Sequence, residues 1–121
     1  MVEIALVDVP DPQVAVAADD PVITAGRDAL AGRTVWHVNT TAVGGGVAEL
    51  LRSAMPRHAS VGIRARWLVM QADQEFFGVT KQLHHLFHGR AGHGRPLGPT
   101  EVTQYERTTR EAAAEALTHM T

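Results

Sequence analysis

The 121-residue chain is long enough for one compact domain, which would bury roughly two-thirds of the surface that its unfolded chain exposes, and too short for a second. Hydrophobic residues make up 45% and charged residues 20%, which excludes a disordered chain, and the net charge of −2 gives no reason to expect nucleic acid or a membrane as partner. With no cysteine, disulfides and thiolate metal sites are excluded, and we expect a cytoplasmic protein.

Residues 1–32 are predicted to form an N-terminal lead-in. The run at 2–9 is rich in β-branched residues and is stopped by two prolines, which predicts an edge strand. A short helix is expected from Thr24 to Leu30, closed by Gly32.

Residues 33–121 are predicted to form a partial Rossmann-like domain, a short parallel sheet with flanking helices. A strand at 34–39 would place Val35, His37 and Asn39 on one side. A helix follows, with an apolar stripe made by Val47, Leu50, Leu51, Ala54 and Met55, and Pro56 is expected to kink or end it. A second strand at 64–70 completes a parallel strand–helix–strand unit.

Two further helices are predicted after these strands. Asp73 is placed to cap a helix from Gln74 to His88, and Thr100 to cap a helix that runs close to Met120. The inward face of the last helix is expected to consist of Val102, Tyr105, Thr109, Ala113, Ala116 and Met120.

The glycine loop, residues 40–46, joins the first strand of this domain to its helix and ends in Gly44, Gly45 and Gly46. Such a loop exposes amide donors at the positive end of a helix dipole, which favours an anion, but it is equally typical of a tight turn or of close strand–helix packing. The residue after Gly46 is Val47 and not the lysine of a P-loop, which excludes an NTPase loop. A dinucleotide-binding oxidoreductase fragment built on Gly44, Gly46 and Asp73 stays an alternative.

Two longer stretches carry a family resemblance. The runs from His37 to Leu51 and from Asp73 to His84, with the strand around Trp67 between them, resemble the N-terminal region of the trehalose glycosyltransferring synthases. These are retaining glycosyltransferases of family 4 with the GT-B fold, in which two Rossmann-like domains face each other across a cleft. The two stretches together are more specific than the glycine loop alone.

The resemblance implies transfer of glucose from a nucleoside-diphosphate glucose to a glucose acceptor, which forms trehalose. It implies that Gly44, Gly45 and Gly46 lend amides to the diphosphate or to the transferred sugar. It also makes Asn39, Thr40, Glu49, Lys81 and His84 candidates for substrate contacts. No cofactor and no nucleophile is implied, because the nucleotide sugar is itself a substrate. The basic residues that read the donor belong to a C-terminal domain in this family, so the 121 residues alone are expected to be inactive.

Several histidines allow other interpretations. His84 and His88 have the i, i+4 spacing that can hold zinc, but without a third ligand we expect no metal. From the residues alone a solvated helix flank is favoured for Lys81 and His84, and only the family resemblance raises a substrate contact above it. A hydrogen-bonded core residue is favoured over a catalytic one for His37.

A non-catalytic module is the remaining alternative. It would use an exposed sheet edge to associate with itself, as a homodimer, or with another chain or the missing C-terminal domain.

Overall fold

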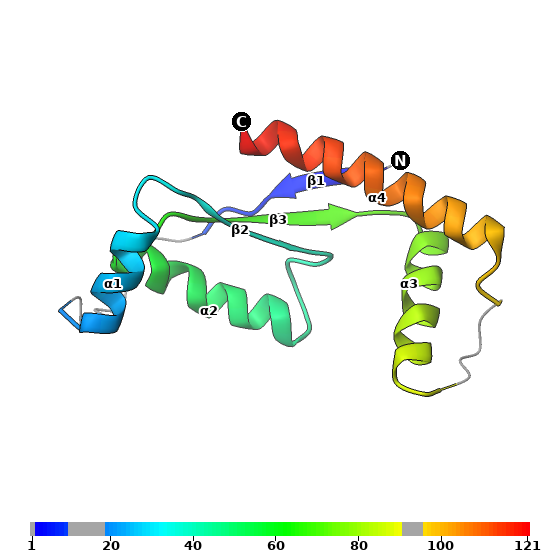
Figure 1. Ribbon diagram of the computed structural model, residues 1–121, viewed down its shortest axis with the longest axis horizontal. Helices are drawn as coiled ribbons and strands as arrows, with labels where there is room; N and C mark the ends of the chain where they lie inside the picture. Colours follow the sequence, from blue (N-terminus) through cyan, green and yellow to red (C-terminus); the bar gives the residue numbers. More distant parts are fainter. Residues whose placement is uncertain (1, 10–18, 91–95) are drawn as a thin grey trace. The chain divides into compact units, whose positions relative to one another are not determined.

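The computed structural model describes residues 2–9, 19–90 and 96–121. Its elements, coloured along the chain in Figure 1, are β1 (Glu3–Leu6), α1 (Pro21–Ala29), β2 (Val35–Asn39), α2 (Gly46–Ser60), β3 (Ala65–Gln71), α3 (Gln74–Phe87) and α4 (Pro99–Met120). The chain divides into two compact units, called here the glycine-loop unit (Ala5–Val69) and the two-helix unit (Met1–Ile4 with Met70–Thr121). Fold class α/β is thereby confirmed.

The sheet has three strands in the order β1-β3-β2. β2 and β3 are parallel, with Val35 opposite Ala65 and His37 opposite Trp67, as a crossover through α2 requires. β1 runs in the opposite direction to β3 (Figure 1), and the Val7 amide donates to the Trp67 carbonyl at 2.9 Å. The predicted parallel pair is therefore present, but the sheet as a whole is mixed, because the first strand joins it as an antiparallel edge.

The core of the glycine-loop unit lies between α2 and the sheet. Its buried members are Ala48, Leu51 and Met55 from α2 with Trp67 and Val69 from β3. Paired residues of parallel neighbours share a face, so His37 and Asn39 of β2 lie on the same side as their partners Trp67 and Val69. The predicted alternation along β2 is confirmed.

Helix α2 does not end at Pro56. It continues to Ser60, and Gly62, at φ 80°, follows the C-cap residue Val61. A proline within a helix removes one backbone hydrogen bond, but Met55 is 3% exposed and anchors this part of α2 in the core. Tertiary packing thus overrides the local breaking tendency.

In the lead-in, the strand is shorter and the helix begins earlier than predicted. β1 covers only Glu3–Leu6, and α1 begins at Pro21 because the Asp20 carboxylate accepts from the Val22 amide at 2.8 Å. Gly32 has the positive φ of 73° expected of a residue that closes a helix end. The two prolines that were predicted to stop the first strand lie outside the described residues.

The two-helix unit contains α3 and α4. Asp73 caps α3 as predicted, with its carboxylate accepting from the Phe76 amide at 2.8 Å. The buried Phe76 ring stacks on Tyr105 of α4, with ring centroids 5.7 Å apart. No helix among the residues described above is long and apolar enough to span a membrane.

The start and the inward face of α4 differ from the prediction. The helix begins at Pro99, and the Glu101 carboxylate accepts from the Gly98 amide at 2.9 Å, so Thr100 is not the cap. Thr108 and Ala112 are buried, whereas Val102 is 51% exposed.

Candidate functional site at the glycine loop

Two of the three loop glycines have backbone angles that other residues avoid. Gly44 has φ 72°, and Gly45 has φ 83° with ψ 155°, a region that is almost exclusive to glycine. Gly46 has no positive φ and is the first residue of α2. A Cβ built on any of the three would meet no atom within 4 Å. The turn interpretation therefore holds for Gly44 and Gly45, while close packing explains none of the three.

Unused amide donors lie where α2 begins. The Glu49 amide donates to the Gly45 carbonyl at 3.2 Å and starts the helical hydrogen bonding. The amides of Gly46, Val47 and Ala48 have no acceptor within the described part of the chain. Gly45 is the N-cap residue and supplies no side-chain acceptor. These donors and the helix dipole make the loop chemically suited to an anion.

Asn39 ties the loop to the core. Its Oδ1 accepts from Trp67 Nε1 at 2.8 Å, and its Nδ2 donates to the Thr41 carbonyl at 2.8 Å. The Thr41 hydroxyl also donates to the Val43 carbonyl. One N–H of the Asn39 amide is left over for a ligand, so a substrate contact stays compatible with this structural role.

Arg52 is a residue of the candidate site that sequence reasoning missed. Its Nη2 and Nε donate to the Ala42 carbonyl at 2.6 and 3.0 Å, and its guanidinium carbon lies 5.8 Å from the centre of the Trp67 ring. The side chain thus fixes the loop from α2 and brings a positive charge to it. Its position on α2, two turns after the last glycine, was the only signal in the sequence.

The remaining predicted site residues fall into two groups. Thr40 and Glu49 are exposed in the glycine-loop unit, Thr40 in the loop itself and Glu49 in the first turn of α2. Lys81 and His84 are exposed on α3 of the two-helix unit. The structure therefore brings Asn39 and Thr40 together with the three glycines.

Within the described ranges the ring contacts of His84 are local, and its ring centroid lies 4.2 Å from that of His88. The His88 ring nitrogen Nδ1 lies 2.9 Å from the His84 carbonyl oxygen. Among the described residues, no group of three or more His, Cys, Asp or Glu side chains is arranged to hold a metal ion.

A second feature that sequence reasoning missed is a pair of stacked histidines. His37 of β2 and His58 of α2 have parallel rings with centroids 5.8 Å apart. His37 Nε2 and His58 Nδ1 are buried and have no hydrogen-bond partner within the described ranges. The hydrogen-bonded core histidine that we predicted at position 37 is therefore instead a stacked one.

This pair predicts that stability falls in mild acid. Burial, and then the neighbouring His37, lower the pKa of His58 below its ordinary 6.5. The unfolded chain therefore binds a proton at higher pH than the folded one, so the stability due to neutral His58 is complete above pH 6.5 and is lost as the pH falls through the folded pKa.

Urea unfolding between about pH 7.5 and 5.5 tests this expectation. His58→Phe keeps a ring on His37 but cannot titrate, so we expect the variant to lose less stability than the wild type over that range. Parallel pH profiles for the two proteins would contradict the assignment.

Comparison with known proteins gives one consistent result. Residues 37–121 match the family model described as "Trehalose synthase, N-terminal domain". The chain is 52% identical over 60 residues to a protein named trehalose synthase from Pyrococcus horikoshii, and 37% identical over 93 residues to one of the same name from Rubrobacter xylanophilus. These alignments cover 50% and 76% of the chain but only 14% and 22% of the two relatives. The chain thus corresponds to a minor part of each.

Proposed function

The chain belongs to the family of the trehalose synthase N-terminal domain, and on this basis we propose that it is the acceptor-side part of a trehalose-forming glycosyltransferase. The complete enzyme would transfer glucose from a nucleoside-diphosphate glucose to free glucose, within a two-domain GT-B architecture. The curated relatives named trehalose synthase support the product, since the chain is similar to one segment of each.

Two features of Gly46 together carry the proposal. Amides at the start of α2 have no acceptor among the described residues, and the folded chain gives no reason for a glycine at this position. The φ of Gly46 is not positive and nothing lies within 4 Å of a built Cβ, so the folded chain itself does not require glycine there. A ligand that approaches the backbone closely would require it. In our proposal the amides around Gly44, Gly45 and Gly46 contact the donor diphosphate and stabilise the charge that develops on the leaving group.

The substrate contacts follow from the same proposal. Asn39, Thr40 and Glu49 would bind sugar hydroxyls near the loop, and Lys81 and His84 would contact substrate from α3. Arg52 would hold the loop in shape and add a compensating positive charge. The residues that read the nucleotide would come from a further domain, so no cofactor is needed and the 121 residues alone would not catalyse transfer.

The oxidoreductase alternative loses its main support. Asp73, which would have bound a ribose, uses its carboxylate to cap α3. Family membership points away from it as well. The interaction-module alternative keeps one observation in its favour, because β2 is an edge strand and Val38 is 53% exposed.

One experiment with two readouts tests the proposal. The purified chain is mixed with UDP-glucose or ADP-glucose and with glucose, while amide resonances and trehalose are followed. We expect the amides of Gly44, Gly45 and Gly46 to shift in a saturable way and no trehalose to form. Trehalose made by the chain alone would refute the need for a second domain, and unshifted loop amides would refute the diphosphate site.

A further inference from the structure

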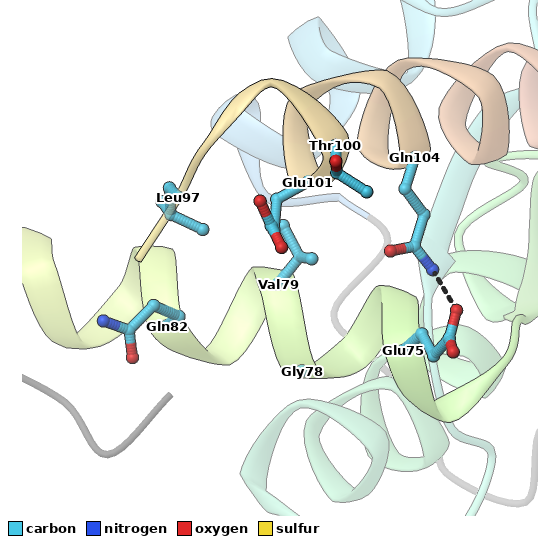
Figure 2. A pocket seen from close by; sticks show the side chains of 8 residues that line it. All are labelled: Glu75, Gly78, Val79, Gln82, Leu97, Thr100, Glu101 and Gln104. Atoms are coloured by element: carbon cyan, nitrogen blue, oxygen red, sulfur yellow. Dashed lines mark hydrogen bonds between the residues drawn. The ribbon is translucent and has the colours of Figure 1, made fainter. Parts of the chain in front are cut away.

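A separate pocket lies within the two-helix unit, between α3 and the start of α4. Its volume is about 380 Å³, which suits one small ligand. Figure 2 shows the lining, which α3 provides through Glu75, Gly78, Val79 and Gln82 and the α4 side through Leu97, Thr100, Glu101 and Gln104. The four α3 residues recur at i, i+3, i+4 and i+7 and so form one continuous face. Neither Lys81 nor His84 belongs to it.

The polar groups of this pocket are held in place by the protein. Gln104 Nε2 donates to one carboxylate oxygen of Glu75 at 3.2 Å, the bond drawn in Figure 2. One carboxylate oxygen of Glu101 accepts from the Gly98 amide at 2.9 Å. Each carboxylate keeps its second oxygen for another donor. A ligand with several hydroxyl groups would satisfy these fixed acceptors.

Another part of the pocket lining consists of aliphatic side chains and of a glycine, which has no side chain. Val79 of α3 and Glu101 of α4 point toward each other in Figure 2, and Leu97 adds a second aliphatic side chain to the lining. Gly78 lies in the interior of α3, where glycine costs roughly 0.5–1 kcal/mol relative to alanine. A Cβ built on it meets nothing within 4 Å, so packing does not account for the glycine. Any longer side chain at this position would project into open space beside the pocket lining.

Charge limits what can bind. Among the described residues, the lining contains two carboxylates and no Lys, Arg or His, which disfavours phosphorylated ligands. No metal-holding cluster is found in the described ranges, which disfavours a divalent ion. The ring of a sugar could present C–H groups to Val79 and Leu97 and hydroxyls to the fixed carboxylates.

We propose that the pocket between α3 and α4 binds an unphosphorylated sugar of one or two rings. The argument rests on the lining alone and does not depend on glycosyl transfer at the glycine loop.

Titration of the 121-residue chain with glucose and with trehalose, followed by amide resonances, tests this site. We expect saturable shifts centred on Val79 and Gln104, with a Kd of about 1 mM, and a weaker effect of glucose 6-phosphate. Gly78→Leu places a bulky side chain in the pocket lining, and we expect affinity to fall at least about tenfold. Gly78→Ala should weaken binding less while strengthening the helix.

Gly26→Ala is the matched control. Gly26 also lies within a helix, α1, and a Cβ there also meets nothing within 4 Å, but it does not line the pocket. We expect its sugar affinity to equal that of the wild type. Unchanged binding in Gly78→Leu, equal binding of glucose 6-phosphate, or no saturable shift on α3 and α4 would each overturn the proposal. Shifts confined to Gly44, Gly45 and Gly46 would overturn it and leave the glycine-loop site intact.

Discussion

Replacing Trp67 by alanine is expected to lower the free energy of unfolding by about 3–5 kcal/mol. Trp67 is 1% exposed and packs in the same core cluster as Leu51 and Met55, so truncation leaves a cavity between β3 and α2. Because a domain of this kind is stabilised by only about 5–15 kcal/mol, a large part of the total would be lost. Urea unfolding followed by far-UV circular dichroism measures the change.

Trp67→Phe tests the contribution of the Trp67 hydrogen bond separately from the loss of side-chain volume. Phenylalanine fills most of the space but cannot donate to Asn39 Oδ1, and an unsatisfied part-buried acceptor costs about 1–3 kcal/mol. Trp36 provides the matched control, because its ring is only half-buried and lies 5.3 Å from the Arg66 guanidinium carbon. We expect Trp36→Phe to cost clearly less, and equal costs at the two positions would contradict the role given to the Asn39 bond.

Replacing Gly45 by alanine is expected to destabilise the chain by about 1–3 kcal/mol. The backbone there has φ 83° and ψ 155°, where the Cβ of any L-residue is strained whatever space surrounds it. Gly46→Ala is the matched control, since the neighbouring glycine has an ordinary φ and equally open surroundings. We expect that variant to stay within about 0.5 kcal/mol of the wild type in urea unfolding. A similar loss in both variants would show that the loop is constrained by something other than the Gly45 backbone.

The strand–helix–strand unit could be predicted because its signals are local. Alternating residues in β2, the spacing of Leu51 and Met55 in α2 and the cap at Asp73 are read within a few positions of each other. The rest of the predicted α2 stripe is less accurate, because Val47 and Leu50 are 59% and 65% exposed. The end of α2 could not be predicted in this way. The tendency of Pro56 to end a helix competes with the burial of Met55, and only the folded chain reveals that burial.

The candidate site was predicted less completely than the fold. The sequence alone identified the three loop glycines, Gly44, Gly45 and Gly46. The hydrogen bonds that hold the loop in place, however, join residues that are far apart in sequence. Arg52 reaches Ala42 across ten positions and Trp67 reaches Asn39 across 28. The pairing of His37 with His58 likewise depends on how α2 lies on β2. No local pattern encodes such contacts.

The prediction of the buried face of α4 was wrong for a different reason. Apolar residues occur around the whole helix, and the small or polar residues Thr108 and Ala112 are the buried ones. A stripe chosen by hydrophobicity therefore selected Val102 and Tyr105, which are exposed.

The glycine loop as a diphosphate site is tested most directly by titrating the wild type and Gly46→Ala in parallel with a nucleoside-diphosphate glucose. The substitution leaves the fold intact by the argument above but places a methyl group where the ligand would meet the backbone. We predict saturable binding to the wild type and affinity at least about tenfold weaker in the variant, with both proteins equally stable to urea. Equal affinity in the two proteins, or no binding to the wild type, would contradict the account.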